Sequence, residues 1–262
     1  ILLYNFASVY IVLFNKKPMK TLVIIPSRLS ATRLPGKPLL KINGKSMISH
    51  VFKKAEEANI GEVIVATEDQ EIVDDVKKNG GQVILTKKNH KTGTDRIYEA
   101  LQKFNTSDID LVMNLQGDEP LMSIEDIIGL NNQMIKNQSE LGTLASEIKD
   151  KTIYENQNIV KAITTEKLDD FNFPEAINFM RKDLKNTKNI YHHLGIYCYQ
   201  KETLKNFVSF NQSKNELKNK LEQIRALDNN IKINVALSKS SPIGVDTKED
   251  FLAIKKIMEY KS

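Results

Sequence analysis

The sequence has only one cysteine among its 262 residues, and this shortage excludes several kinds of protein. With Cys198 alone, the chain cannot form an intramolecular disulfide or a cysteine-rich zinc site, and a reducing compartment is the natural expectation. Cys198 lies in the apolar run GIYCY, where we expect it to be a small buried residue.

The N-terminal apolar run, ILLYNFASVYIVLF, is too short to span a bilayer comfortably. No basic segment precedes it and no small-residue cleavage site follows it, so we expect no stable membrane insertion. Met19 begins MKTLVIIPSR, which looks like a natural start. We therefore expect residues 1–18 to be a non-core extension, and a chain beginning at Met19 to fold and remain active.

Arginine is also scarce, although the formal net charge is +5 and lysine and arginine together number 38. The lysines are scattered beside glutamate and asparagine, which indicates a solvated surface, and we expect no nucleic-acid partner. A guanidinium fits phosphate or carboxylate bidentately, so the few arginines are candidate anion-binding residues, although some could simply pair with surface carboxylates. They are Arg28, Arg33, Arg96, Arg181 and Arg225.

Short apolar runs rich in β-branched residues alternate with segments of helical periodicity. The runs LVIIP, EVIVAT, QVILT and DLVMNL have the length and composition of buried strands. Between them, apolar residues fall on one helical face, as at Ile72, Val73 and Val76. With 40% hydrophobic and 27% charged residues, the chain is globular, and this order predicts an α/β fold with a mostly parallel, right-handed doubly wound sheet.

Polar loops follow the predicted strands. They comprise residues 27–37, 67–69, 90–96 and 116–120. Ligands of doubly wound sheets bind beyond the carboxyl ends of the strands, so we expect these four loops to converge on one edge.

The triplet Gly44-Lys45-Ser46 does not form a Walker-type phosphate loop. Such a loop needs a glycine five residues earlier, where this chain has Leu39, and there is no GxGxxG after the first strand. INGKS instead predicts a turn before a helix that begins near Ser46. The phosphate loop must be the preceding segment, where Arg28, Arg33 and Lys37 bring three cations suited to a polyphosphate.

Two aspartates are candidate ligands for the magnesium that accompanies a triphosphate, because magnesium prefers hard oxygen ligands. Asp118 follows a buried strand and precedes Pro120, which would hold the carboxylate outward. Asp246 precedes the final helix, although Asp246 or Thr247 could simply cap that helix.

Six motifs in this order resemble the 3-deoxy-manno-octulosonate cytidylyltransferase family, also called CMP-KDO synthetases. They are PSRLSATRLPGKPL, HKTGTDR, NLQGDEP, HLGIYCY, LEQIR and GVDTKEDF, spread from Pro26 to Phe251. RLPGKPL alone would suggest only the wider sugar-nucleotidyltransferase group, whereas HLGIY and LEQIR make the resemblance specific.

The resemblance implies a Rossmann-like, GT-A-type fold with a mostly parallel mixed sheet and helices on both faces. It implies one domain over residues 19–262, with a nucleotide-binding half at about 19–150, a sugar-binding and dimerisation part at about 151–240, and a closing part at 241–262. The implied protein is a cytoplasmic homodimer that uses Mg²⁺. It activates 3-deoxy-D-manno-octulosonate (KDO) with CTP, giving CMP-KDO for lipopolysaccharide biosynthesis and releasing pyrophosphate.

The resemblance also implies three sets of site residues. The CTP-binding set is Ser27, Arg28, Arg33, Lys37, Thr92, Gly93, Arg96, Gln116 and Asp118. The metal ligands are Asp118 and Asp246, which with Lys37 and Arg28 form the catalytic set. The sugar-binding set is Arg181, His193, Tyr197, Glu222 and Gln223, with Arg181 as the expected anchor of the sugar carboxylate.

On a strand, His192 should face away from its neighbour His193, and we place no metal on either residue. We expect an in-line attack by the anomeric hydroxyl of KDO on the α-phosphorus of CTP, with positioning and charge neutralisation supplying most of the catalysis. Two alternatives stay open. The substrate could be another acidic sugar, such as 8-amino-KDO or a sialic-acid-like compound, or the chain could be a catalytically inactive nucleotide-binding paralogue.

Overall fold

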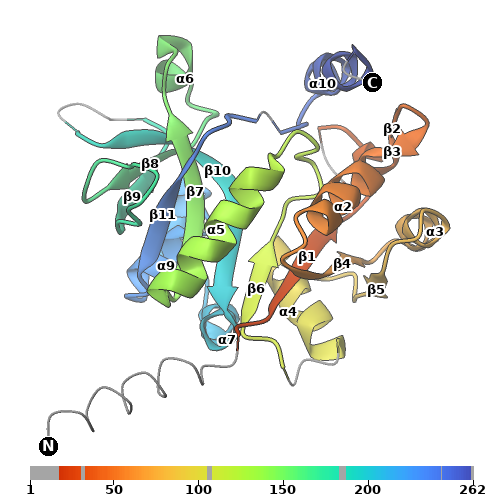
Figure 1. The fold of residues 1–262 in the computed structure, drawn as a ribbon, viewed down its shortest axis with the longest axis horizontal. Helices are drawn as coiled ribbons and strands as arrows, with labels where there is room; N and C mark the ends of the chain where they lie inside the picture. Colours follow the sequence, from red (N-terminus) through yellow and green to blue (C-terminus); the bar gives the residue numbers. More distant parts are fainter. Residues whose placement is uncertain (1–17, 31–32, 105–107, 183–186, 243, 261–262) are drawn as a thin grey trace, which may run out of the picture.

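The computed structural model describes residues 18–30, 33–104, 108–182, 187–242 and 244–260 (Figure 1). The extension expected at residues 1–18 lies outside this part except for its last residue, so that expectation stays a prediction. None of the helices in the described ranges is both long enough and apolar enough to cross a bilayer.

A mixed sheet runs through the whole molecule, with strands from both halves of the chain. Its main path has the order β11-β7-β10-β6-β1-β4-β5, and β8 and β9 extend it beside β10. The strands are β1 (Thr21–Ser27), β4 (Gly61–Thr67), β5 (Val83–Leu85), β6 (Leu111–Asn114), β7 (Leu141–Glu147), β8 (Lys161–Thr164), β9 (Ala176–Met180), β10 (Ile190–Gln200) and β11 (Ile233–Ser238). A separate hairpin consists of β2 (Lys41–Ile42) and β3 (Lys45–Ser46).

Helices cover both faces of this sheet, as the α/β pattern predicts (Figure 1). They are α2 (Met47–Glu57), α3 (Gln70–Lys78), α4 (Gly93–Lys103), α5 (Ile124–Asn137), α6 (Lys151–Glu155), α7 (Lys201–Ser209), α8 (Lys214–Asn219), α9 (Ile224–Asp228) and α10 (Lys248–Tyr260), with a 3-10 turn η1 (Lys37–Leu39). Helix α2 begins where the sequence predicts, because Ser46 caps it by accepting a hydrogen bond from the Ser49 backbone N–H.

The alternation of side chains along β1 explains why there are two cores. Leu22 and Ile24 belong to a buried cluster that includes residues of α4, α7 and α9, whereas Val23 and Ile25 belong to a second cluster with residues of α2, α3 and α5. Successive side chains of a strand point to opposite faces, so an entirely apolar strand must be covered on both sides. Cys198 is fully buried in the second cluster, as expected.

Strands β4, β5 and β6 run parallel to β1, and β10 runs antiparallel to its three neighbours, β6, β7 and β8. The pairing of β10 with β7 shifts register between Leu194 and Tyr197, which marks a bulge. Because β10 lies beside β6, this bulge is close to the loop that follows β6.

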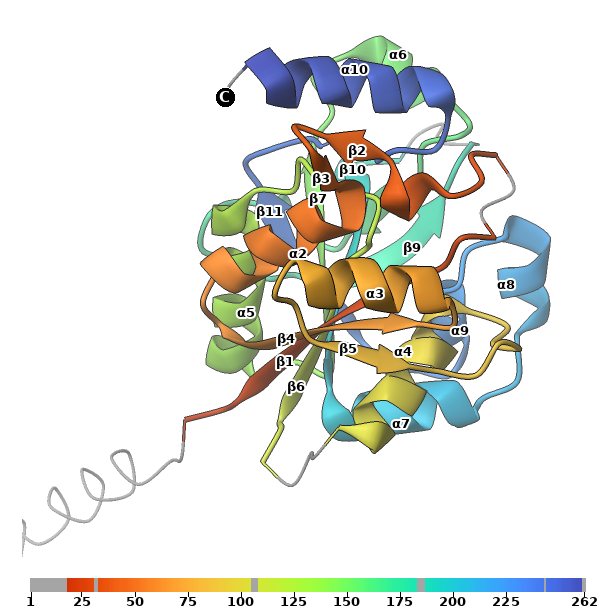
Figure 2. The ribbon, with the colours of Figure 1, turned by 90° about the vertical axis from the view of Figure 1, so that its right-hand side faces the viewer.

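The last helix returns to the first half of the chain. Phe251 and Ile254 of α10 pack with Ile42 and Met47 of the hairpin and the start of α2 (Figure 2). The turn of this hairpin contains Asn43 and Gly44 with φ of 47° and 77°, so INGKS is a turn before a helix, as predicted. The packing of α10 brings the loop before it against the loop that follows β1.

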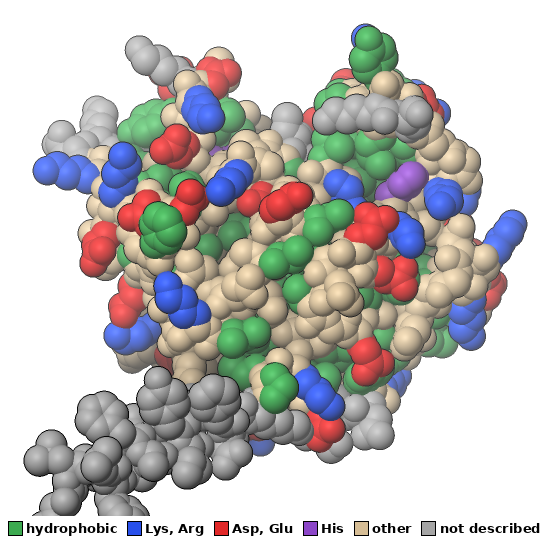
Figure 3. Space-filling model, in the orientation of Figure 1, with side chains coloured by type: hydrophobic (Ala, Val, Ile, Leu, Met, Phe, Trp, Pro, Cys, Tyr) green, Lys and Arg blue, Asp and Glu red, His purple; other side chains and the backbone are tan. Residues whose placement is uncertain are grey.

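On the face shown in Figure 3, lysine and arginine side chains are interspersed with aspartate and glutamate. This face therefore has the mixed, solvated character that the lysine pattern indicates.

Candidate active site

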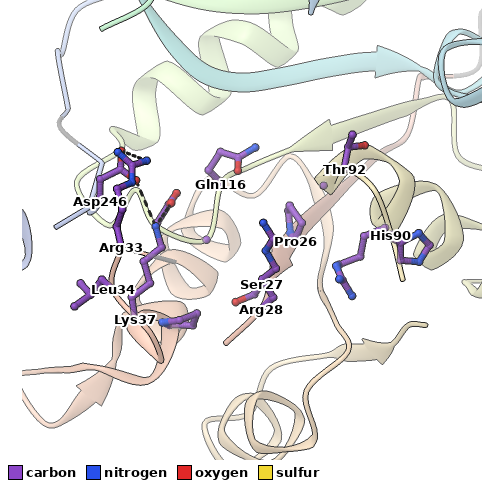
Figure 4. A pocket seen from close by; sticks show the side chains of 15 residues that line it. Pro26, Ser27, Arg28, Arg33, Leu34, Lys37, His90, Thr92, Gln116 and Asp246 are labelled. Carbon is purple, nitrogen blue, oxygen red and sulfur yellow. Dashed lines mark hydrogen bonds and ion pairs between the residues drawn. The ribbon is translucent and has the colours of Figure 1, made fainter. Parts of the chain in front are cut away.

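A cleft of about 330 Å³ lies at the carboxyl ends of β1 and β6, where the polar loops converge. All nine residues of the predicted CTP-binding set line it, together with Asp246. Figure 4 shows Asp246, Arg33 and Lys37 at one end and Thr92 and His90 at the other, with Ser27 and Arg28 between them. Three of the four predicted loops therefore line the cleft, whereas no residue of the fourth, 67–69, does; this loop contacts the cleft wall through the ion pair of Glu68 with Arg96. The role of each residue stays a prediction.

The two predicted metal ligands meet at one ammonium group. Lys37 Nζ lies 2.5 Å from Asp118 Oδ2 and 3.7 Å from Asp246 Oδ1, and it also donates to the Val245 carbonyl at 2.7 Å. Arg33 Nη2 lies 3.0 Å from Asp246 Oδ2. Carboxylates from distant parts of the chain thus form one cation-binding point beside the phosphate loop.

The Asp246 side chain does not cap the final helix, α10. Thr247 Oγ1 accepts from the Asp250 backbone N–H at 3.2 Å, and Asp250 Oδ2 accepts from the backbone N–H groups of Asp246 and Thr247. Of the two residues that could cap the final helix, Thr247 therefore does so, and the Asp246 carboxylate faces Lys37 and Arg33. The role of Asp246 as a metal ligand stays a prediction.

This pair of carboxylates fits a magnesium ion that arrives with a nucleotide. Magnesium is commonly held by one or two carboxylates together with substrate phosphates. The described residues contain no group of three or more His, Cys, Asp or Glu that could form an all-protein metal cage. Since Lys37 Nζ already lies between the two carboxylates, their oxygens are arranged to face a cation.

The other end of the cleft is the N-terminus of α4. Thr92 caps this helix in a capping box with Asp95, and Gly93 is its first residue. Arg96 lines the cleft, but its guanidinium is only 4% exposed and lies 2.5 Å from Glu68 Oε2 and 2.5 Å from Thr86 Oγ1. Arg96 therefore braces α4 against the loop after β4 as well as contributing to the cleft wall.

Three of the predicted sugar-binding residues, His193, Tyr197 and Glu222, lie outside the cleft lining, with His193 buried and the other two partly buried. The rings of His193 and Tyr197 are 5.5 Å apart, and His193 Nε2 lies 3.0 Å from Thr143 Oγ1. Burial lowers the pKa of His193 to about 3, so this imidazole is neutral. Burial raises the pKa of Tyr197 well above its usual value, and the nearby Glu222 and Glu119 carboxyls add to the rise.

Glu222 connects these residues to the nucleotide end of the site. Burial raises the pKa of its carboxyl, and the nearby Thr94 and Thr92 side chains partly offset that rise. Its Oε1 atom is buried without a hydrogen-bond partner among the described residues. Gln223, the next residue, is buried as well.

Arg181 does not line the cleft. It follows β9, and its Nη1 donates to the Asn158 carbonyl at 2.5 Å. Its predicted contact with the sugar carboxylate stays a prediction. His192 binds Ser241 Oγ through Nδ1 at 2.9 Å, away from the Thr143 contact of His193, as strand alternation predicts.

Arg225 is a structural arginine. It forms two hydrogen bonds with the Glu216 carboxylate, at 2.9 Å and 2.6 Å, and its guanidinium lies over the Phe207 ring. The alternative that some arginines only pair with carboxylates applies here, although this carboxylate is buried.

Two residues of this region lie in loops that the sequence predicts to converge, 90–96 and 116–120, but the sequence assigned neither of them a role. His90 lines the cleft, and its place at the start of HKTGTDR was the available signal. Glu119, inside GDEP, is partly buried with its Oε2 atom enclosed, and its pKa is raised to about 8 by burial and by the Asp118 and Asp246 carboxylates. Burial of a carboxyl in that motif is visible only in the fold.

The sheet with helices on both faces and the cleft beyond its carboxyl ends are typical of α/β proteins that bind nucleotides. The family described as Cytidylyltransferase matches residues 22–233. Among curated proteins, the chain is 38% identical over 242 residues to a 3-deoxy-manno-octulosonate cytidylyltransferase of Bartonella tribocorum, covering 92% of this chain and 99% of that protein. It is 40% identical over 243 residues to one of Rhodopseudomonas palustris, covering 92% and 98%.

Solved structures agree with this assignment. A CMP:2-keto-3-deoxy-manno-octonic acid synthetase complexed with CTP has a TM-score of 0.84 and 31% identity, covering 93% of this chain and 100% of that one. A UDP-glucose pyrophosphorylase complexed with UDP-glucose, with a TM-score of 0.70 and 14% identity over 93% and 100% of the two chains, shares the fold alone. The chain belongs to the cytidylyltransferase family, among the 3-deoxy-manno-octulosonate cytidylyltransferases.

Proposed function

We propose that this chain transfers the cytidylyl group of CTP to KDO, giving CMP-KDO and pyrophosphate. The observation that carries the proposal is the meeting of Asp118 and Asp246 around Lys37 in the cleft lined by the CTP-binding motifs. The names of the curated relatives and of the CTP-bound neighbour support the same reaction.

The nucleotide lies along the cleft, with its triphosphate at the cationic end. Arg28 and Lys37 hold phosphate oxygens, and Arg33 contributes a further cation at the rim. Ser27 Oγ is buried without a partner among the described residues, so a hydroxyl is available for the ligand. Thr92 and Gly93, at the N-terminus of α4, contact the cytosine and ribose end.

Asp118 and Asp246 would hold a Mg²⁺ ion that arrives with the nucleotide, and the ion would neutralise charge on the phosphates and lower the pKa of the attacking hydroxyl. Lys37 balances the negative charge of the same two carboxylates.

The sugar acid binds beside the cleft, toward β10. Neutral His193, Tyr197 and the unpaired Oε1 of Glu222 contact its hydroxyls, and Arg181 anchors its carboxylate. The anomeric oxygen forms a bond to the α-phosphorus while the bond from that phosphorus to the oxygen bridging to the β-phosphate breaks. Pyrophosphate leaves with that oxygen, and the hydroxyl proton passes to water.

The test is pyrophosphate release by the purified chain with Mg²⁺, measured over CTP, UTP, ATP and GTP and over KDO, 8-amino-KDO and a sialic acid. We expect turnover to be highest with CTP and KDO. Higher turnover with another sugar acid would identify that compound, and not KDO, as the substrate. Tight CTP binding without pyrophosphate release from any sugar acid would identify an inactive nucleotide-binding paralogue.

We also propose that the protein works as a homodimer in the cytoplasm and supplies lipopolysaccharide biosynthesis. Phe171 and Ile177, in the predicted dimerisation part, are 82% and 59% exposed, which favours an apolar contact there. Light scattering of the purified chain should give twice the monomer mass. A monomer mass across the working concentration range would contradict the homodimer.

A further inference from the structure

Lys161, the first residue of β8, is a fully buried lysine. Its Nζ donates to the Asn156 carbonyl at 2.5 Å and to the Arg181 carbonyl at 3.4 Å, and among the described residues it has no carboxylate partner. Burial and the nearby charge of Arg181 both lower the pKa of this ammonium. Burying an ammonium without a carboxylate is costly, so its presence needs a reason beyond packing.

The strand pairing shows what the Lys161 side chain adds. Lys161 pairs with Met180 of β9 on one side and with His192 of β10 on the other, so β8 lies between these two strands (Figure 1). The pairing of β8 with β9 ends at Lys161 and Met180, and Arg181 is the next residue of the chain. The Arg181 carbonyl is therefore held by the Lys161 ammonium and not by a further strand pair.

The Arg181 guanidinium binds the same short turn that Lys161 binds. Its Nη1 donates to the Asn158 carbonyl at 2.5 Å, two residues after the Asn156 carbonyl that accepts from Lys161. The other N–H groups of the guanidinium have no partner among the described residues. They can therefore bind a planar anion such as a carboxylate while the turn and Lys161 hold the residue in place.

Arg181 continues the face of β9 that contacts the predicted sugar-binding residues. Phe179, two residues earlier, packs edge-on against His193, with 5.0 Å between the ring centroids. Side chains two residues apart along an extended chain share one face, so this alternation places Arg181 on the His193 side of the sheet. Only β8 separates β9 from β10, so these two strands are about 10 Å apart, twice the spacing of neighbouring strands.

We propose that Lys161 is a positioning residue that holds Arg181 ready for the carboxylate of the sugar acid. The inference rests on the proposed function, because it takes Arg181 as the anchor of that carboxylate. The Lys161 ammonium fixes the Arg181 carbonyl, and its charge adds to that of the guanidinium. A carboxylate that binds Arg181 therefore meets two cations, and its charge stabilises both.

The first test measures the KM for KDO and the affinity for CTP in the full chain with Lys161→Met, which keeps the length of the side chain and removes the ammonium. We expect the KM for KDO to rise about tenfold or more, the scale of one charge-assisted hydrogen bond. The affinity for CTP, measured by calorimetry without a sugar, should stay the same. Lys167→Met, at an exposed position after β8, is the matched control and should keep both values. An unchanged KM for KDO in folded Lys161→Met would overturn the proposal.

A double-mutant cycle separates the positioning of Arg181 from a general structural effect. Arg181→Met should raise the KM for KDO at least as much as Lys161→Met does. Adding Lys161→Met to Arg181→Met should then cause little further rise, because the anchor is already gone. If the two effects multiply in full, Lys161 acts independently of Arg181 and the proposal is wrong.

A measurement on the unaltered protein covers the case in which Lys161→Met does not fold. The pKa of the Lys161 ammonium, followed by nuclear magnetic resonance of the side-chain nitrogen, should rise when KDO binds, because a carboxylate on Arg181 stabilises the charged form. The same pKa with and without KDO, when calorimetry shows that KDO is bound, would contradict the proposal. Failure of the proposed function would instead be seen in the unaltered protein, as missing turnover with CTP and KDO.

Discussion

Replacing Asp118 by asparagine removes one charge from the carboxylate pair and keeps the shape of the side chain. In the structure, Asp118 Oδ2 lies 2.5 Å from Lys37 Nζ, and the Asp118 side chain is 30% exposed, against 49% for Asp246. Asp118 is therefore the better shielded of the two carboxylates, and its charge is less screened by water.

The expected fall in kcat follows from the interaction energy between the Asp118 charge and a cation beside it. Two unit charges about 4 Å apart interact by about 4 kcal/mol at an effective dielectric constant of about 20. If the variant loses two thirds of this interaction energy in the transition state, about 2.7 kcal/mol, turnover falls about a hundredfold. We therefore expect Asp118→Asn to lower kcat on the order of a hundredfold or more.

The assay is pyrophosphate release with CTP and KDO over a range of Mg²⁺ concentrations. Asp118→Asn should also need more Mg²⁺ for half-maximal rate, because one hard oxygen ligand is weakened. Asp74→Asn, which neutralises an exposed aspartate of α3, is the control and should keep both values. A turnover of Asp118→Asn near that of the control, with an unchanged Mg²⁺ requirement, would refute the metal assignment.

Three further predictions concern Lys37, Arg225 and His193. Lys37→Met should raise the KM for CTP and lower kcat, because it removes the cation between Asp118 and Asp246; unchanged kinetics would show that Lys37 acts on neither phosphate nor carboxylates. Arg225→Ala should lower the free energy of unfolding in urea by about 3 kcal/mol, because it leaves Glu216 buried and unpaired; no change would mean that the pair is not stabilising. The pKa of His193 is about 3 in the folded protein, below the unfolded value, so the unfolded state binds more protons as the pH falls from about 6.5 to 3. His193 should therefore reduce stability by up to about 1.4 kcal/mol per pH unit over that window, and His193→Gln should flatten the measured slope; an identical slope would contradict a neutral buried His193.

Much of the nucleotide half follows from local sequence. The apolar run of β1 requires helices on both faces, since Leu22 and Val23 point to opposite sides and both are buried. Strand order then places the loops after β1 and β6 at one edge, so Ser27 and Gln116 were predicted together without coordinates. A Walker-type loop was excluded because the position that must be glycine is Leu39 in this chain.

The sugar side was less predictable, because β10 enters the sheet between β6 and β7 from far along the chain. No local pattern near His193 indicates a bulge at Gly195, a hydroxyl from Thr143 inside it, or a neutral imidazole. Whether Arg181 would reach the other sugar-binding residues also depends on tertiary packing, and in this structure its guanidinium contacts Asn158.

The sequence by itself determined the fold class, the cation-rich loop at Arg28, Arg33 and Lys37, and the two candidate aspartates, because strand composition and residue chemistry are local properties. Only the tertiary structure decided that Asp118 and Asp246 share one ammonium, that Arg96 is braced by Glu68, and that Glu119 is enclosed. Distances between residues remote in sequence are set by the packing of α10 on the hairpin and of β10 in the sheet, and packing depends on the whole chain at once.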